Sequence, residues 1–324
     1  MQVGLQLPSR LGPAALTQRD LIEMAVLADT TPGWDHLWVP DSVLALPFYD
    51  SVVSLAACAA VTSRVRLGVA CMASLGLRQP LVVAQQWANL DALSGGRMTL
   101  VACPGQPAGQ AQVRELAAFG LTRDEKIERM AEAIAFLRAV SSGQPVSFSG
   151  RHIRVEDLSL APPFVQRPLP IWLAANPPAD APPGVVERLL RRVAKLGDGW
   201  LTFAVTPGLL AGRLALLREI AEHEGRPLGP GFDVCVYLNV NVDTDERRAL
   251  DDATATWNSE LARPVSPDRV RELAAVGAPG RCAERVAEME EAGATAVVLG
   301  LLSADPRRQV RAVTEELLPL LTGS

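Results

Sequence analysis

Residues 65–103 read VRLGVACMASLGLRQPLVVAQQWANLDALSGGRMTLVAC and contain one complete strand–helix–strand unit. A first strand is predicted over Val65–Cys71, where apolar residues alternate with arginine and glycine. A helix is predicted over Pro80–Leu93, because proline suits the first helical position and the Ser94-Gly95-Gly96 sequence supplies an end. A second strand follows over Met98–Cys103. Two strands that are joined through a helix pair in parallel, so this stretch predicts a βαβ unit.

The same alternation runs along the rest of the chain. Eight strands are predicted, over Val3–Leu7, Leu37–Val39, Val65–Cys71, Met98–Cys103, Ile171–Ala175, Trp200–Phe203, Phe232–Val242 and Thr295–Leu301. Apolar residues at helical spacing separate them, and the last helix is predicted from about Arg307 to Leu321. Eight such units in 324 residues suit a closed α/β barrel of the (β/α)8 TIM type better than an open sheet. We therefore expect residues 1–324 to form a single domain of this kind.

Two segments do not fit the repeat. Residues 141–170 contain short apolar runs around Val146-Ser147-Phe148 and Ile153, followed by a proline-rich stretch. They predict a small hairpin excursion between strands 4 and 5, with a solvated connector as the alternative. The acidic run Asp243–Asp252 predicts the start of a helical insertion before strand 8.

Composition limits the classes of function. The chain has 31 basic and 36 acidic residues, a formal charge of −5 and scattered arginines, which disfavours a nucleic-acid partner. No apolar run reaches the ~20 residues that cross a bilayer, and the first residues lack a secretory leader. The cysteines are widely spaced and predict free thiols in a reducing compartment: Cys58, Cys71, Cys103, Cys235 and Cys282. We expect a cytoplasmic protein that acts on a small molecule, and a homodimer stays open.

In a barrel of this type the functional site lies at the carboxyl ends of the strands. This rule selects the following candidates: Gln6, Asp41, Cys71, Cys103–Gln106, Ala175, Asn176, Phe203, Asn239 or Asn241, and Ser303. The set contains few acids and bases, and it contains no paired carboxylate, metal-type cluster, nucleophile elbow or Walker loop. Such a site is typical of chemistry that an organic cofactor carries, so no metal is expected.

Several motifs follow one another in the order of a known family. They are GWDHLWVPD at Gly33–Asp41, LDALSGGRM at Leu90–Met98, GRH at Gly150–His152, LSLAPP at Leu158–Pro163, PIWLAA at Pro170–Ala175 and DGW at Asp198–Trp200. Together they resemble the bacterial luciferase-like monooxygenase superfamily of flavin- or F420-dependent oxidoreductases over nearly the whole chain. Each motif alone is weakly specific, whereas the ordered set is quite specific.

This resemblance implies a barrel that binds reduced FMN or the deazaflavin coenzyme F420 at the carboxyl ends of the strands. It also implies a bulge in the third strand, often with a non-proline cis peptide, that supports the ring system of the cofactor. That position falls on Val69, Ala70 and Cys71, and an ordinary strand end is the alternative. Only Lys126 and Lys195 among the 31 basic residues are lysine. This bias is typical of a high-GC bacterial genome and slightly favours F420 over FMN.

The resemblance also places two candidate catalytic residues. Asp41 matches the acidic residue that follows the second strand near the cofactor ring, although Ser42 stands where many F420 enzymes have histidine. A turn residue after Pro40 is the alternative for Asp41. Gln106 takes the approximate place of a proton-donating carboxyl, but an amide cannot act as a general acid near neutral pH. We therefore expect Gln106 to position a substrate or a ring carbonyl.

Further cofactor contacts are implied after strands 4 and 5, at Cys103, Pro104, Gly105, Ala174, Ala175 and Asn176. Relatives approach the cofactor phosphate with backbone N–H groups after the fifth strand, yet four of the eight residues 176–183 are prolines and donate none. Either arginines such as Arg192 hold the phosphate or its binding is weak, and a plain surface loop is the alternative. Cys71 and Cys103 end neighbouring strands, and we expect them to pack against the ring and not to act as nucleophiles.

Three functions are compatible with these residues. The first is an oxidoreductase that transfers a hydride between reduced F420 and a small organic substrate. The second is an FMN-dependent monooxygenase, in which the reduced flavin captures oxygen. The third is a diverged, non-catalytic flavin-binding member, which the departures at Ser42, Gln106 and Pro177-Pro178 would allow.

Overall fold

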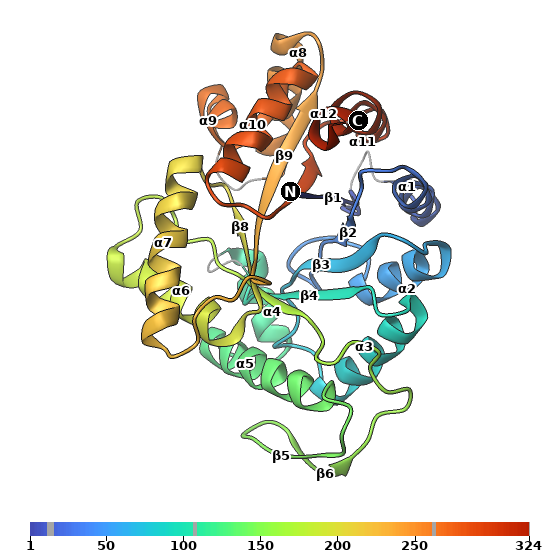
Figure 1. Cartoon of the computed structure of the whole chain (residues 1–324), viewed down its shortest axis with the longest axis vertical. Coiled ribbons are helices and arrows are strands. Elements are labelled where there is room, and N and C mark those ends of the chain that lie inside the picture. Colours follow the sequence, from blue (N-terminus) through green and yellow to red (C-terminus); the bar gives the residue numbers. More distant parts are fainter. Residues whose placement is uncertain (12–15, 106–108, 261–263, 324) are drawn as a thin grey trace.

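A closed barrel of parallel strands forms the centre of the molecule, which a computed structural model describes over residues 1–11, 16–105, 109–260 and 264–323 (Figure 1). Within these residues eight strands follow one another around the barrel: β1 (Gln2–Gln6), β2 (His36–Val39), β3 (Arg66–Met72), β4 (Met98–Ala102), β7 (Ile171–Ala174), β8 (Gly199–Phe203), β9 (Asp233–Val242) and β11 (Ala296–Leu301). Pairing of β9 with both β8 and β11 closes the ring. The predicted (β/α)8 fold is therefore confirmed.

Helices surround the barrel, as Figure 1 shows. They are α1 (Gln18–Thr30), α2 (Ser51–Val61), α3 (Pro80–Ser94), α4 (Gln110–Ala118), α5 (Arg123–Val140), α6 (Pro183–Leu196), α7 (Pro207–His223), α8 (Glu246–Glu260), α9 (Pro267–Leu273), α10 (Pro279–Glu291), α11 (Pro306–Ala312) and α12 (Leu318–Thr322), with a π-helical turn over Val313–Leu317. Throughout the described ranges, no helix combines the length and the apolar character that crossing a membrane requires.

The two irregular segments take the forms predicted for them. An antiparallel hairpin of β5 (Val146–Ser149) and β6 (Arg154–Leu158) follows α5, and α8 and α9 form the helical insertion before β11. Two elements were not predicted. The short strand β10 (Ala274–Gly277) continues directly from α9 and pairs with the far half of β9. Helix α4 begins at Gln110, and the preceding N-cap residue, Gly109, has no side chain to cap it, so the sequence offers no start signal of the serine, threonine, aspartate or asparagine type.

The interior of the barrel is filled by large apolar side chains. Trp38 of β2 and Trp172 of β7 pack there with ring centroids 5.5 Å apart. Gly68 of β3 makes room for them, because a Cβ at that position would collide with the indole of Trp38. A second and larger cluster packs the outer faces of the strands against the helices. The strand ends are thereby fixed as the rim of a filled, rigid core.

At the amino end of the barrel lies a cavity of about 280 Å³, on the opposite side from the predicted site. Its lining residues include His36, Arg66 and Asp233, at or near the starts of their strands. The His36 ring is 3% exposed, stacks on Trp38, and its Nε2 lies 2.9 Å from Oε1 of Gln2. Burial, together with the positive charge of Arg66, lowers the pKa of His36 to about 3. The folded protein therefore keeps this ring neutral.

This buried histidine predicts a pH dependence of stability. Between pH 6.5 and about 3 the unfolded chain takes up a proton at His36 and the folded chain does not, so acidification favours unfolding. We expect His36 to account for a loss of about 2 kcal/mol in the free energy of unfolding between pH 6.5 and 5. Urea unfolding of the wild type and of His36→Gln at pH 7 and 5 measures it. The glutamine variant should lose less on acidification, and equal losses would contradict the assignment.

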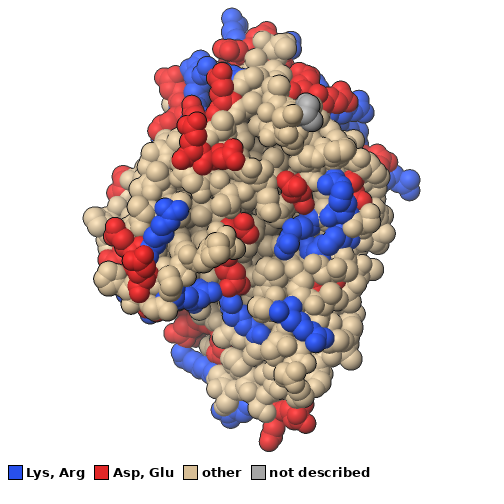
Figure 2. Space-filling model, viewed as in Figure 1, with Lys and Arg blue, Asp and Glu red and all other residues tan. Residues whose placement is uncertain are grey.

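Charged side chains are interspersed over the face shown in Figure 2, where lysine and arginine alternate with aspartate and glutamate. Ion pairs form at the surface of the protein, among them Arg226 with Asp198 at 2.9 Å and Arg191 with Glu224 at 2.6 Å. Exposed pairs of this kind contribute little to stability, typically about 0.5 kcal/mol each. The free energy that holds the barrel therefore comes from its two apolar layers.

Candidate active site

The ends of β3 and β4 form one side of the rim at the carboxyl end of the barrel. The pairing register of these strands shifts between Ala70 and Met72, and the Ala70–Cys71 peptide bond is cis. The bulge and the cis peptide predicted for this position are therefore present. Val69, which precedes them, is 0% exposed and packs in the layer between barrel and helices, so in this structure it supports the rim from below and is not accessible to a ligand.

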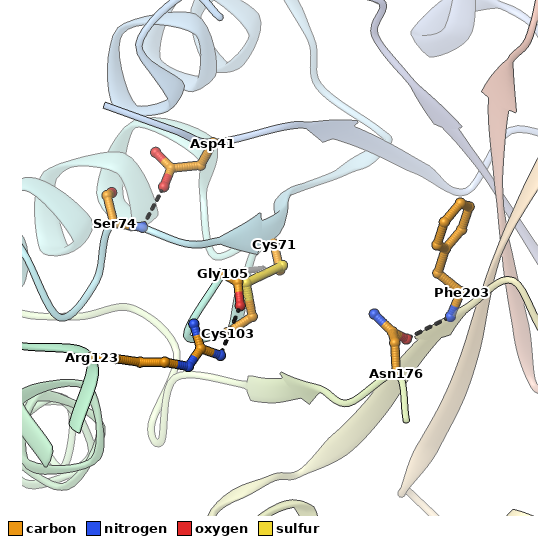
Figure 3. Close-up of a disulfide and its surroundings, with 8 residues drawn as sticks. All are labelled: Asp41, Cys71, Ser74, Cys103, Gly105, Arg123, Asn176 and Phe203. Carbon is orange, nitrogen blue, oxygen red and sulfur yellow. Dashed lines mark hydrogen bonds between the residues drawn. A yellow bond between two sulfur atoms is a disulfide. The ribbon is translucent and has the colours of Figure 1, made fainter. Parts of the chain in front are cut away.

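Cys71 and Cys103 form a disulfide across this rim, with their Cα atoms 5.9 Å apart (Figure 3). The prediction of free thiols was wrong for these two residues. That they end neighbouring strands was expected; the physical reason for the difference is the register of β3 against β4, which shifts between Ala70 and Met72 and brings the two side chains within bonding distance. Cys58, Cys235 and Cys282 are buried free thiols, as predicted.

Asp41 follows β2 and lies beside this rim, but its carboxylate is completely buried. It accepts hydrogen bonds from Oγ of Ser51 at 2.7 Å and from the backbone N–H of Ser74 at 2.8 Å. The guanidinium of Arg78 lies 3.3 Å away. The carboxylate thus joins the end of β2 to the start of α2 and to the loop between β3 and α3, as Figure 3 shows for Ser74. A carboxylate held in this way fixes the shape of the rim.

The floor of the site is apolar. Ala70, Cys71, Ala174 and Tyr237 are only partly buried and pack on the cluster inside the barrel. Three of these four side chains are small, so they present a largely apolar surface with little bulk. The ring of Tyr237 borders it and meets Phe203 edge-on at a centroid distance of 5.3 Å. A flat, mostly apolar group fits such a floor.

A buried ion pair lies behind the turn that follows β4. Lys126 of α5 and Glu115 of α4 are 5% and 4% exposed, and their charged groups lie 3.4 Å apart. Glu115 also accepts the backbone N–H groups of Leu44 and Ala45 at 2.9 and 3.1 Å. Gly105 lies directly against this ion pair: a Cβ added to Gly105 would lie 3.5 Å from Nζ of Lys126. The pair therefore ties α4, α5 and the loop after β2 to the site.

The loop that follows β7 is held by side chains from its neighbours. Oδ1 of Asn176 accepts the N–H of Phe203 at 2.7 Å, which Figure 3 shows. The buried guanidinium of Arg213 donates to the carbonyls of Pro177 and Pro178 at 2.6 and 2.9 Å. Ala175 is 6% exposed and packs toward the helices. The side-chain amide of Asn176 and the backbone carbonyls of Pro177 and Pro178 thus hold this loop at the rim.

Three arginines gather between α5 and α6 near this rim. Burial lowers the pKa of Arg192, and the positive charges of Arg123 and Arg188 lower it further, so both of these groups act electrostatically on the guanidinium of Arg192. Nη2 of Arg123 also lies 3.5 Å from the carbonyl of Gly105 (Figure 3). Arg192 makes no hydrogen bond or ion pair with any described residue. A concentration of like charge of this kind favours an anionic ligand.

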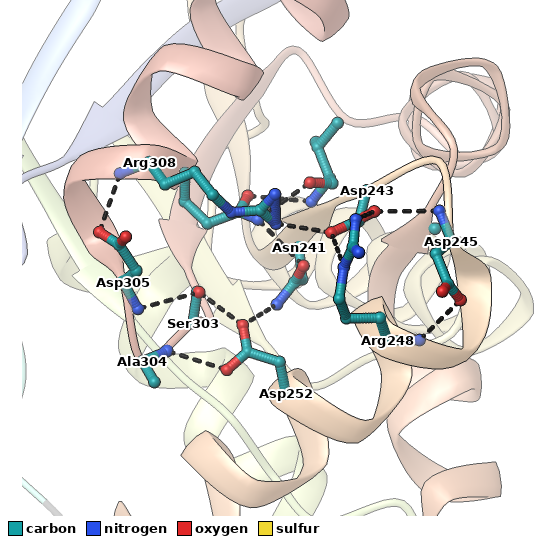
Figure 4. Close-up of polar contacts among 12 residues, drawn as sticks. Asn241, Asp243, Asp245, Arg248, Asp252, Ser303, Ala304, Asp305 and Arg308 are labelled. Atoms are coloured by element: carbon teal, nitrogen blue, oxygen red, sulfur yellow. Dashed lines mark hydrogen bonds and ion pairs between the residues drawn. The ribbon is translucent and has the colours of Figure 1, made fainter.

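The insertion closes the opposite side of the rim. Trp257 of α8 packs on Phe203 at a centroid distance of 6.2 Å. Asp252 of α8 accepts hydrogen bonds from Oγ of Ser303 and from Nδ2 of Asn241, at 2.5 and 2.8 Å, as Figure 4 shows. The predicted site residues included Ser303 and either Asn239 or Asn241; Ser303 and Asn241 here anchor α8 to the ends of β11 and β9.

Most of the predicted site residues therefore lie together at the carboxyl end of the barrel. Gln106 falls outside the described residues. Sequence reasoning missed Lys126, Arg123 and Tyr237. A signal existed for Lys126, because it lies four residues before Met130 on the buried face of α5, where a lysine requires a partner.

Comparison with known proteins agrees with this arrangement. A family model described as luciferase-like monooxygenase matches residues 1–296. An F420-dependent glucose-6-phosphate dehydrogenase from Beutenbergia cavernae is 27% identical, over 98% of this chain and 97% of that protein.

Two solved structures are similar to the whole chain. An F420-dependent secondary alcohol dehydrogenase in complex with an F420–acetone adduct superposes with a TM-score of 0.80 at 18% identity, over 99% of this chain and 98% of that one. A monooxygenase from Streptomyces bottropensis superposes with a TM-score of 0.77 at 26% identity, over 98% and 99%. The first likeness concerns the fold alone.

Proposed function

Because the chain belongs to the luciferase-like monooxygenase family, a family of enzymes, we propose that it transfers a hydride between reduced F420 and a small organic substrate. The observation that carries the choice of F420 is the full-length similarity to a dehydrogenase that uses this cofactor. When bound, reduced F420 supplies the hydride. The protein has to hold donor and acceptor carbons close together and to exclude water.

The residues at the rim fit such a cofactor. Its flat ring matches the apolar floor of Ala70, Cys71 and Ala174, where side chains are small and partly exposed. Gly105 has a φ of 74° and carries no side chain, so the turn after β4 leaves the ring edge accessible. Phe203 and Tyr237 supply a wall against which an organic substrate packs. The apolar surroundings exclude water from the reacting carbons.

For the cofactor phosphate we propose the arginine cluster of Arg123, Arg188 and Arg192. The proline run after β7 donates few backbone N–H groups, and the carbonyls of Pro177 and Pro178 are engaged by Arg213. Guanidinium groups replace backbone amides well here, since they form bidentate, charge-assisted bonds to phosphate.

Replacement of one member of the cluster tests this assignment. We expect Arg192→Ala to weaken F420 binding by about tenfold or more, because a charge-assisted hydrogen bond to phosphate contributes about 1.5–3 kcal/mol. Arg191→Ala is the matched control, since Arg191 is the next residue on α6 and pairs with Glu187 and Glu224 at the surface. Fluorescence titration measures both affinities. Equal F420 affinities of Arg192→Ala and Arg191→Ala would show that Arg192 does not bind the cofactor phosphate.

We assign positioning roles to the two residues predicted to be catalytic. Asp41 is fully occupied by donors from Ser51, Ser74 and Arg78, so it keeps the β3–α3 loop in place beside the ring. Gln106 directly follows Gly105 and, as an amide, orients a substrate or a ring carbonyl. In this proposal the reacting proton comes from the substrate or from solvent.

A second candidate, an FMN-dependent monooxygenase, is favoured by the similarity to the Streptomyces monooxygenase at 26% identity. Binding titrations with F420 and with FMN, followed by oxygen consumption with each reduced cofactor, separate the two. Tight binding of F420 without oxygen uptake supports the dehydrogenase, whereas FMN binding with oxygen uptake supports the monooxygenase. We further propose a cytoplasmic, single-domain protein that acts as a monomer or homodimer, which sedimentation of the purified chain tests.

A further inference from the structure

The Cys71–Cys103 disulfide lies in the middle of the proposed ring site. Cys71 belongs to the apolar floor, and Cys103 directly precedes the Pro104-Gly105 turn. No part of the function described above uses this bond. In a reducing compartment a disulfide is usually transient and either catalytic or redox-sensing, and only rarely a permanent brace.

The two cysteines differ in exposure. Cys103 is 7% exposed, whereas Cys71 is only half-buried at the floor. An external thiolate therefore attacks the sulfur of Cys71 and expels the sulfur of Cys103 as a thiolate. Two cationic groups, Lys126 and Arg123, lie beside Gly105, two residues beyond Cys103. Nearby positive charge stabilises a departing thiolate and makes it a better leaving group.

The remaining cysteines cannot take part in such an exchange. Cys58 and Cys282 are free thiols in the core, and burial raises the pKa of each to about 12. Cys235 is also a buried free thiol, and burial raises its pKa as well. Cysteine reactivity depends on the fraction of thiolate and on exposure. The three free thiols are buried and protonated, so among the five cysteines the pair at the rim is the one placed to react.

We propose that Cys71 and Cys103 form a reversible dithiol–disulfide site that controls cofactor binding at the rim, a proposal that rests on the proposed function. Two equivalents of a small thiol reduce the bond: two S–H groups form on the protein, and the thiol leaves as its own disulfide. The disulfide joins the ends of β3 and β4 and fixes the Cys103–Gly105 turn before the ring arrives. Reduction frees this turn, so the ligand has to order it on binding.

The first arm of the test needs no cofactor. The native protein is equilibrated in buffers of reduced and oxidised glutathione, quenched with acid, alkylated and mapped by mass spectrometry. We expect two labels to appear together, at Cys71 and Cys103, and to disappear again on oxidation. The site is contradicted if the two cysteines remain unpaired in oxidised buffer, or if labelling of the pair requires a denaturant.

The second arm measures F420 and FMN affinity for the same protein in its oxidised and reduced forms. We expect binding of the accepted cofactor to be about tenfold weaker after reduction, because ordering a turn costs about 1.4 kcal/mol. Cys71→Ser and Cys103→Ser should bind at the reduced level in both buffers. Cys58→Ala, which changes a thiol outside the rim, should keep the full redox response.

The outcomes separate the two proposals. Equal affinity in both redox states, with normal labelling, overturns the control of binding and leaves the proposed function intact. Failure of both cofactors to bind in either state contradicts the proposed function, and with it the control of binding, whereas the labelling arm still decides whether the dithiol–disulfide pair exists.

Discussion

Replacing Gly105 by tryptophan should abolish cofactor binding while the barrel stays folded. Gly105 borders the proposed ring site, and a Cβ added there would contact Ala73 and Nζ of Lys126 at 3.6 and 3.5 Å without a clash. An indole added there fills the volume that the ring needs, so we expect affinity to fall about 100-fold or more. The far-ultraviolet circular dichroism spectrum should be unchanged, because Gly105 lies in a turn outside the helices and strands.

Gly105→Ala is the matched control for this variant. The backbone at residue 105 has a φ of 74°, so any side chain there carries a conformational cost of about 1–2 kcal/mol. Alanine and tryptophan share this cost, and only tryptophan fills the ring site. Calorimetric titration with F420 or FMN should show near-normal binding for alanine and none for tryptophan. If both variants lose cofactor binding, the cause is the change in the backbone at residue 105. If both variants bind the cofactor normally, the ring does not bind beside Gly105.

The barrel itself was predictable because its signals are local. Strand Val65–Cys71 alternates with period two, helix Pro80–Leu93 has a proline start and a glycine end, and both recur with small boundary shifts in β3 and α3. The rule that sites lie at the carboxyl ends of the strands then places Asp41 and Asn176 without further information.

Contacts between distant segments were beyond the sequence. The strand order predicted that Cys71 and Cys103 end neighbouring strands and could meet, but the disulfide between them depends on the register of β3 against β4, which no spacing pattern gives. The three donors around Asp41 come from two other segments, the start of α2 and the loop between β3 and α3, so the burial of Asp41 and its hydrogen bonds are properties of the folded rim. The same holds for Lys126, whose partner Glu115 lies on α4, a helix without a start signal.

Breaking the buried ion pair of Lys126 with Glu115 should cause the largest change in the free energy of unfolding. Lys126→Met removes the ammonium and leaves the carboxylate of Glu115 buried, with only the N–H groups of Leu44 and Ala45 as partners. An uncompensated buried charge is costly, so we expect the free energy of unfolding to fall by about 3 kcal/mol. Urea unfolding followed by tryptophan fluorescence measures the loss. Cofactor affinity should fall as well, since Gly105 packs on this lysine.

The double variant Lys126→Met, Glu115→Gln separates the charge from the packing. Glutamine keeps an oxygen that accepts from Leu44 and Ala45, and methionine fills the volume of the lysine chain. Replacing a whole buried pair is often close to neutral, so the double variant should recover to within about 1 kcal/mol of the wild type. If it is as unstable as the single variant, the lysine stabilises the site through contacts that methionine does not reproduce. Recovery shows that the single variant loses stability because the charge of Glu115 is left uncompensated, and that a neutral pair can replace the ion pair between α4 and α5.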